Sequence, residues 1–192
     1  MKKETEVLVI GGGLAGSEAA YYLASHGIKT TLVEMKPKKF TPAHESENYG
    51  ELVCSNSLKS NDVYANACGL LKEEMRILGS MIIEAADNTK VPAGAALAVD
   101  REKFSAYITE KLKSCPNLTL VCEEVEKLPD LQKDGDRYAI IATGPLTSEG
   151  LSEDILRATG GGLHFFDASA PIVSAESVDM SCAFTGDRYG KG

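Results

Sequence analysis

A glycine-rich turn near the amino terminus carries the clearest chemical potential in this chain. The stretch Gly11–Gly16 follows the apolar run Val7–Ile10 and precedes a run typical of a helix. In a strand–turn–helix unit, the first glycine permits a tight turn, the second lets a pyrophosphate approach the backbone, and the third lets helix and strand pack closely. The helix N-terminus also offers free N–H groups to phosphate oxygens. The pattern predicts a dinucleotide site, with a glycine-rich loop that binds no ligand as the alternative.

Two further features extend this predicted site. Glu34 ends a second apolar run, Lys29–Val33, at roughly the 20-residue offset where a carboxylate binds ribose hydroxyls. A second turn, Ala142–Gly144, follows the apolar run Tyr138–Ile141 and is of the kind that two-dinucleotide flavoproteins place near FAD, although an ordinary turn is the alternative. The predicted cofactor-binding residues are Gly11, Gly12, Gly13, Leu14, Ala15, Gly16, Glu34, Ala142, Thr143 and Gly144.

One cysteine stands among small polar residues. Cys54 follows a long predicted loop off the first nucleotide unit, which places it near the expected flavin. Ser55–Ser57 can cap a following helix, whose N-terminus would lower the pKa of a nearby thiol. A thiolate beside a flavin implies covalent or redox chemistry, whereas a small buried cysteine is the alternative. Core or surface roles are expected for the other cysteines, Cys68, Cys115, Cys122 and Cys182.

Composition limits the classes of protein that this chain can represent. Its 192 residues, 43% hydrophobic and 25% charged, are typical of one soluble globular domain or one domain with an insertion. No apolar run approaches a membrane span, no signal peptide is recognisable, and the cysteines form no metal or disulfide pattern, so a reducing cytoplasm is expected. A net charge of −8 argues against an extended nucleic-acid surface on this part alone. Lys36, Lys38 and Lys39 form a compact basic cluster, expected in a solvated loop, with phosphate contact as the alternative.

The hydrophobic spacing predicts the elements that position these residues. Strands are expected at 5–10, 29–34, 118–122, 138–141 and 163–167. Helices are expected over 14–26, 69–84, 101–113 and 148–159, with Gly27 after the first and Asp100 as the N-cap of the third. The apolar stripe of the helix 69–84 is expected to face the core: Leu71, Met75, Leu78 and Ile82. Lys72, Glu73 and Arg76 are expected to face solvent.

These elements predict an α/β fold. We expect a Rossmann-like FAD-binding domain of the glutathione-reductase type over residues 1–192, with a helical and β insertion at approximately 51–90. Residues 35–52 read as a long loop, and loops of that length are usually functional or disordered. We find no candidate for the segment that returns to the flavin ring in such folds, so we expect an incomplete domain.

Further motifs join the glycine turn in one pattern. They are Glu51–Leu58, Gly69–Met75, Pro92–Gly94, Val99–Arg101, Ala142–Ser148, Asp167–Val173 and Arg188–Gly192. Together they resemble the TrmFO family, bacterial folate- and FAD-dependent tRNA (uracil-5-)-methyltransferases related to GidA (MnmG). The resemblance covers essentially the whole chain. The blocks around Cys54 and at Asp167–Val173 separate it from GidA and from generic FAD oxidoreductases.

The resemblance implies a function, a set of cofactors and partners. The family makes 5-methyluridine in the T-loop of tRNA, takes its carbon from 5,10-methylenetetrahydrofolate, and uses reduced FAD as hydride donor with NAD(P)H regenerating the flavin. It implies a catalytic role for Cys54 beside the flavin. Family members are more than twice as long, and their second catalytic cysteine lies beyond this stretch, so we expect the amino-terminal portion of such an enzyme, inactive alone. The implied location is the cytoplasm, without a membrane partner; no motif indicates an oligomeric state.

Two other functions fit the same residues. One is a flavin oxidoreductase acting on a small molecule, with Cys54 as a redox thiol. The other is a nucleotide-binding fragment without activity. Within the family, an rRNA substrate in place of tRNA is a further alternative.

Overall fold

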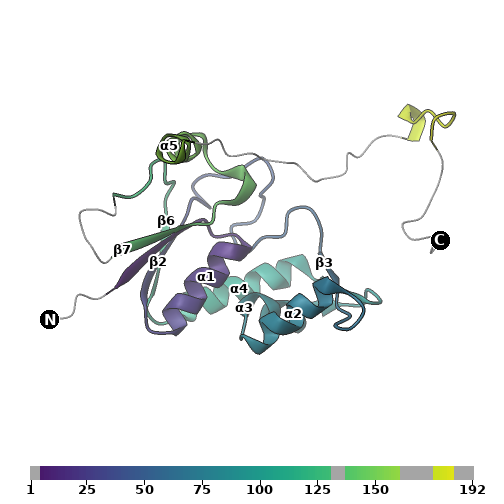
Figure 1. Ribbon diagram of the computed structural model, residues 1–192, viewed down its shortest axis with the longest axis horizontal. Helices are drawn as coiled ribbons and strands as arrows, with labels where there is room; N and C mark the ends of the chain where they lie inside the picture. Colours follow the sequence, from purple (N-terminus) through teal and green to yellow (C-terminus); the bar gives the residue numbers. More distant parts are fainter. Residues whose placement is uncertain (1–4, 131–136, 161–174, 184–192) are drawn as a thin grey trace.

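A computed structural model describes residues 5–130, 137–160 and 175–183 (Figure 1). The strand predicted at 163–167 and the motifs at Asp167–Val173 and Arg188–Gly192 lie outside these residues. In the described part, strands and helices alternate along the chain, with a long excursion between the second and third strands of the main sheet.

Four parallel strands form the main sheet. They are β1 (Glu6–Ile10), β2 (Lys29–Glu34), β6 (Leu118–Cys122) and β7 (Arg137–Ile141), in the spatial order β6-β2-β1-β7. Because the chain leaves β1 towards β2 and later returns to its other side as β7, the strand order reverses at β1. Ligands of open α/β sheets bind outside the carboxyl ends of the strands at such a reversal. The sheet confirms the Rossmann-like fold class.

Helix α1 (Leu14–Ser25) connects β1 to β2 close to its predicted bounds. Ala20 and Ala24 are completely buried, and their small side chains let the helix lie close to the sheet. Gly27, with φ +82°, follows the helix in the left-handed conformation that glycine adopts without steric cost. The helix therefore starts at the first glycine turn and ends where the sequence predicts.

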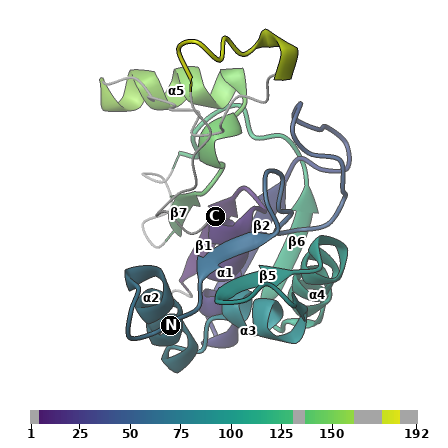
Figure 2. The same cartoon turned by 90° about the vertical axis from the view of Figure 1, so that its right-hand side faces the viewer.

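Between β2 and β6 the chain builds the inserted part. In order, its elements are β3 (Ser57–Ser60), α2 (Ala67–Ile77), α3 (Met81–Asn88), β4 (Lys90–Val91), β5 (Ala96–Val99) and α4 (Arg101–Ser114). The three strands form a small antiparallel sheet in the order β3-β5-β4. Helix α5 (Glu149–Thr159) lies at the far end of the molecule from α2 and α3 (Figure 2). Assigning 51–90 as a separate insertion stays a prediction.

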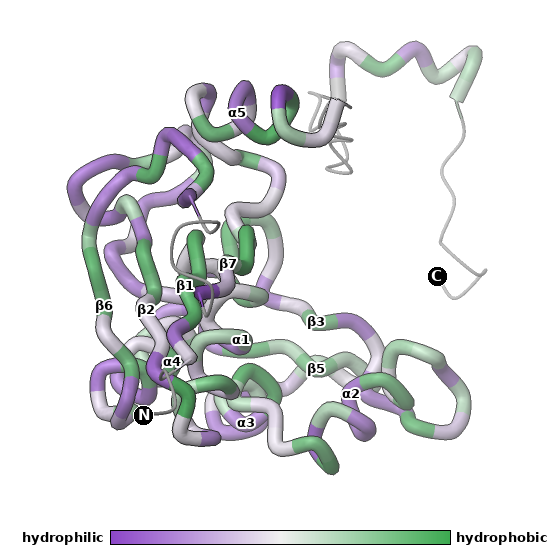
Figure 3. Tube along the Cα trace, turned by 60° about the vertical axis from the view of Figure 1, so that its left-hand side comes forward, coloured by the Kyte–Doolittle hydropathy of each residue, from purple (hydrophilic) through white to green (hydrophobic). Residues whose placement is uncertain are grey.

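The prediction for α4 is confirmed in detail. The Asp100 carboxylate accepts a hydrogen bond of 3.1 Å from the Lys103 N–H, which satisfies one free donor of the first turn. Phe104, Ile108 and Leu112 are completely buried on one face. They join residues of β1, β2, α1, α3 and β5 in one hydrophobic cluster. Hydrophobic residues accordingly mark β1 and parts of the helical region in Figure 3, and the inserted helices share their core with the main sheet.

The single helix predicted over 69–84 is wrong, because the chain breaks at Gly79. That glycine has φ +75°, and Ser80 next to it caps α3 by accepting a 3.2 Å hydrogen bond from the Ile83 N–H. The carboxylate of Glu18 on α1 accepts hydrogen bonds from the N–H groups of Met81 and Ile82. The first turn of α3 is therefore held by α1.

The orientation predicted for α2 is also wrong. Leu71, Ile77 and Leu78 are 56%, 79% and 75% exposed, whereas Lys72 is only 6% exposed. Of the predicted stripe, Ile82 is buried as expected, but it lies in α3. The Lys72 ammonium donates hydrogen bonds of 2.8 Å to the carbonyls of Leu58 and Cys68. These contacts offset the cost of burying the charge, and burial lowers the pKa of Lys72. Helix α2 thus turns its polar face towards β3 and its apolar face towards the surface.

Candidate functional site

A cavity of about 310 Å³ lies at the carboxyl edge of the parallel sheet. Its lining includes Ile10–Ala15, Val33–Lys36, Glu123–Val125 and Ala142–Ser148. The predicted cofactor-binding residues all line it except Gly16, which lies beneath the first turn. The structure thus brings together residues from both predicted glycine turns and the end of β2 at one cavity.

Three glycines of the first turn differ in the space around their Cα atoms. Gly11 has φ +102°, a backbone conformation that other residues rarely adopt, and a Cβ there would lie 2.6 Å from the Ala142 carbonyl oxygen. Both the backbone conformation and the steric clash therefore exclude a larger residue. A Cβ on Gly16 would collide with the Gly11 carbonyl, so this glycine lets α1 approach β1. At Gly13, by contrast, no described atom lies within 4 Å of the Cβ position. The space beside Gly13 can therefore admit a ligand.

The same turn presents an anion-binding end of a helix. Gly13 is the N-cap of α1, and its carbonyl accepts the first intrahelical hydrogen bond, from the Ser17 N–H at 3.0 Å. The N–H groups of the first turn of a helix have no partner within the helix, and the helix dipole adds positive potential there. Since Leu14 and Ala15 line the cavity, this end of α1 can bind phosphate oxygens.

The Glu34 carboxylate lies directly beside the first turn. Its Oε2 accepts a 2.6 Å hydrogen bond from the Gly12 N–H, and its Oε1 accepts one of 3.0 Å from the Lys36 N–H. These contacts fix the carboxylate at the rim of the cavity, where its remaining lone pairs can accept hydrogen bonds from hydroxyl groups. The Tyr49 ring packs against Gly12, and burial together with the Glu34 charge raises the pKa of Tyr49.

The second glycine turn is adjacent to the first. The Ala142 N–H donates to the Ile10 carbonyl at 2.8 Å, which extends the β1–β7 pairing to the start of this turn. Gly144 has φ +67° and begins a short 3-10 helix, Gly144–Leu146, while the hydroxyls of Thr143 and Thr147 are 2.6 Å apart. The structure places this turn beside the first one; its contact with a flavin stays a prediction.

Cys54 is exposed, so the alternative of a buried structural cysteine is wrong. The capped helix expected after it is also wrong, because the following residues form β3 and the next helix begins at Ala67. Its neighbour Val53 lines the cavity, although Cys54 is not among the described lining residues. The Arg101 guanidinium donates to the Val53 carbonyl at 3.4 Å, and Asn56 is hydrogen-bonded to Val99, so the segment around Cys54 is tethered on both sides.

The other cysteines have less exposed or more distant positions. Cys115 is buried, and burial raises the pKa of its thiol, which makes it a poor nucleophile. Cys122 donates weakly to the Met35 carbonyl, with a sulfur–oxygen distance of 3.7 Å. All five cysteines are free thiols. Over the described ranges, no helix is long and apolar enough to span a membrane, and no His, Cys, Asp and Glu side chains gather as a metal site would require.

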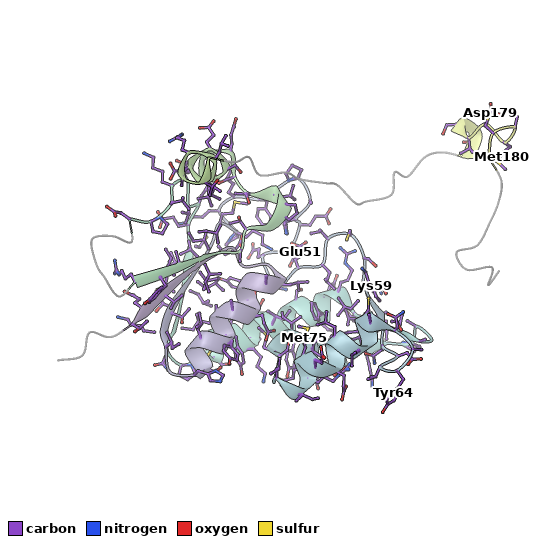
Figure 4. All side chains as sticks on the ribbon, in the orientation of Figure 1. Glu51, Lys59, Tyr64, Met75, Asp179 and Met180 are labelled. Atoms are coloured by element: carbon purple, nitrogen blue, oxygen red, sulfur yellow. The ribbon has the colours of Figure 1, made fainter. Side chains whose placement is uncertain are left out.

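The loop after β2 forms buried polar contacts that the sequence did not predict. Lys36 was expected in a solvated loop, but it is only 6% exposed and forms an ion pair with Glu51. Lys38 is exposed, and Lys39 pairs with Glu124 at 2.6 Å. These partners lie far apart in sequence, so no local spacing predicts them. Figure 4 places Glu51 beside the amino-terminal end of α1, and Glu51 is one of the residues that line the cavity.

The order reversal at β1 and the two glycine turns over one cavity define the dinucleotide-binding class of α/β folds. The model of one family, described as Glucose inhibited division protein A, matches residues 6–192. The chain belongs to this family.

Curated relatives are similar over almost the whole chain. Proteins named methylenetetrahydrofolate--tRNA-(uracil-5-)-methyltransferase TrmFO match it at 55% identity in Staphylococcus carnosus, 58% in Lactobacillus gasseri and 57% in Aquifex aeolicus. These matches cover 97–98% of this chain but only 41–42% of the relatives. The chain therefore spans about two fifths of their length and is homologous to that portion of TrmFO.

Solved structures support the fold independently. A crystal structure of GidA from Aquifex aeolicus superposes with a TM-score of 0.62 at 21% identity, covering 82% of this chain and 31% of that one. A second crystal form gives a TM-score of 0.53 at 23% identity, covering 67% and 21%. At these identities the likeness concerns the fold alone.

Proposed function

We propose that this chain forms the FAD-binding part of an enzyme that makes 5-methyluridine in the T-loop of tRNA. In this proposal 5,10-methylenetetrahydrofolate donates the carbon, reduced FAD donates the hydride, and NAD(P)H regenerates the flavin. The observation that carries it is the 55–58% identity to TrmFO proteins over nearly all of the chain. The cavity over two glycine turns, with space for a phosphate at the end of α1, supports the FAD part of the proposal. Because the chain covers only two fifths of those relatives, we propose the activity for an enzyme of their full length, of which this chain would form one part.

The residues of the cavity fit the nucleotide portion of FAD. The open space beside Gly13 and the N-terminus of α1 would accept the pyrophosphate, whose charge suits the helix dipole. Glu34 would accept hydrogen bonds from the ribose hydroxyls, as its fixed position beside Gly12 allows. Ala142–Gly144 would line the path towards the flavin. When bound, FAD would supply the reducing equivalents that this chain's side chains lack.

We assign Cys54 to the catalytic region. Uracil C5 becomes nucleophilic when a thiolate adds at C6, so the reaction needs cysteine chemistry. Cys54 is exposed next to the cavity wall, and its segment is held by Arg101 and Val99, which suits either a covalent role in carbon transfer beside the flavin or proton removal. The thiolate that adds at uracil C6 would come from the second cysteine, in the portion of the relatives that this chain does not cover. On this view the partners are tRNA and a folate, and the enzyme acts in the cytoplasm.

The partial coverage favours a second candidate for the chain by itself, a nucleotide-binding module without activity. The two candidates share the FAD site and differ in chemistry. The test is to purify the chain and a longer form carrying the remaining portion found in the relatives, and to assay methylation of a tRNA T-loop uridine. We expect the longer form alone to act, and only with both methylenetetrahydrofolate and FAD. Methylation supported by S-adenosylmethionine alone would overturn the proposal.

A further inference from the structure

We propose that Lys36 is a positioning residue for the nucleotide site. Its buried ion pair with Glu51 holds the loop 37–50 against the first glycine turn and thereby keeps Glu34 and the Gly12 N–H where the adenosine ribose binds. The ligand in this inference rests on the proposed function, whereas the positioning rests on the contacts below.

The Lys36 ammonium group is hydrogen-bonded to three acceptors of its own loop. Its Nζ donates to the Ser46 carbonyl at 3.0 Å, to the Asn48 carbonyl at 2.8 Å and to Glu51 Oε2 at 3.1 Å. An ammonium group has three N–H donors, so these contacts use all of them. Lys36 is therefore occupied by its own loop, and the phosphate contact considered for the basic cluster does not suit it.

Glu51 completes the same arrangement from the other end of the loop. Its Oε1 accepts hydrogen bonds of 3.0 and 3.1 Å from the N–H groups of Glu45 and Ser46. Burial pushes the pKa of Glu51 upwards, but these hydrogen bonds and the Lys36 ammonium outweigh it and hold the pKa below its usual value. The carboxylate is thus charged and fully engaged when it meets Lys36.

The loop held in this way touches the nucleotide site at two points. The Gly50 N–H donates to the Gly12 carbonyl at 2.9 Å, and the Tyr49 ring packs against Gly12. Meanwhile the main chain of Lys36 donates to Glu34, whose other oxygen accepts from the Gly12 N–H. One residue therefore contacts Glu34 through its backbone and fixes the loop behind Gly12 through its side chain.

The side chains of Lys36 and Glu51 lie outside the main hydrophobic cluster. That cluster is formed by β1, β2, β5 and the helices α1, α3 and α4, together with Leu52, and Tyr49 packs against it. Removing one partner of a buried ion pair leaves the other charge without compensation, so the loop should be displaced while the core persists. A loss of amide protection confined to Gly12 and Gly50 would indicate that Lys36 positions the turn. A loss of protection throughout the core would indicate a general stabilising role.

The experiment compares Lys36→Met with Lys38→Met, a matched control two positions along the same loop whose side chain is exposed. Amide hydrogen exchange reports on Gly12, Gly50 and the strand β1, and calorimetric titration measures the affinity for ADP as the probe. In Lys36→Met we expect Gly12 and Gly50 to lose protection while β1 keeps it, and ADP to bind about tenfold more weakly, a change within the range of coupling between contacting groups. Lys38→Met should change neither quantity.

A third variant adds a readout that simple loss of packing would not give. In Lys36→Met/Glu51→Gln the uncompensated carboxylate is gone, so ADP affinity should recover partly relative to Lys36→Met. Unchanged exchange at Gly12 and Gly50 in Lys36→Met would overturn the inference, and so would loss of protection throughout β1. If the unaltered chain binds neither ADP nor FAD, the proposed function fails for this chain, and the exchange data still decide whether Lys36 positions the turn.

Discussion

Replacing Gly13 with alanine should weaken FAD binding while leaving the stability of the fold almost unchanged. Gly13 has φ −71° and ψ −167°, a conformation open to any residue, and no described atom lies within 4 Å of the added methyl group. The folded state therefore meets no clash. The loss of chain entropy in the unfolded state favours alanine by about 0.4–1 kcal/mol, and the poorer N-cap preference of alanine opposes it by a similar amount. We expect the free energy of unfolding to change by less than about 1 kcal/mol.

Ligand binding should respond very differently to the same change. The methyl group would occupy the space assigned to the FAD pyrophosphate, and forcing one methyl group into a filled contact costs about 1–3 kcal/mol. The FAD dissociation constant should therefore rise roughly 5- to 150-fold. Flavin fluorescence titration measures this change, and urea unfolding monitored by circular dichroism measures stability.

Gly16→Ala provides the opposite control. Its methyl group would collide with the Gly11 carbonyl, which is main chain and cannot rotate away, so this variant should lose stability before any effect on FAD can be assigned. If Gly13→Ala bound FAD as tightly as the unaltered chain, the pyrophosphate would not lie beside Gly13 and the reasoning would be refuted.

Three other outcomes follow from burial, thiol exposure and charge. Ile77→Lys should change the free energy of unfolding by less than about 0.5 kcal/mol because Ile77 is 79% exposed, whereas Ile108→Ala should lower it by about 2–5 kcal/mol because that side chain is fully buried; equal losses in urea unfolding would contradict this. Alkylation at pH 8 followed by mass spectrometry should modify Cys54 well before Cys115, which is buried and has a raised pKa; equal rates would be inconsistent with the described burial. The lowered pKa of Glu51 gives stability that is complete above its unfolded value of about 4.5 and is lost as pH falls through the lower folded value, so Glu51→Gln should show a weaker decline of stability below about pH 5 than the unaltered chain.

The parts of the fold that follow from local patterns could be predicted from the sequence. The glycine turn, α1 and β2 were predictable because Gly11 and Gly16 are required by the backbone of one short segment, and the apolar periods of a strand and a helix flank that segment. Helix α4 was predictable because Asp100 and the stripe through Ile108 both mark it within a few residues. The strand before Ala142 was predictable from its apolar run, but its parallel pairing with β1, which brings Ala142 beside Gly11, is seen only in the structure.

The errors come from contacts between residues far apart in the chain. Apolar spacing predicted an inward stripe on α2, but the buried Lys72 finds its carbonyl partners in Leu58 and in its own helix, and this reverses the helix. The break at Gly79 is stabilised by Glu18, more than sixty positions earlier. Lys36 looked like a solvated loop residue because its acceptors lie ten or more residues away. Periodicity carries no information about such partners.

The most direct measurement of the central claim is a titration of FAD into the isotopically labelled chain, followed by amide chemical shifts in NMR spectra. The largest shifts are expected at Gly11–Ala15, at Glu34 and at Ala142–Gly144, with α2 unaffected because no residue of α2 lines the cavity. Saturable shifts confined to those residues would support the assignment of the cavity to FAD. Shifts centred elsewhere, or none at FAD concentrations in the millimolar range, would contradict it.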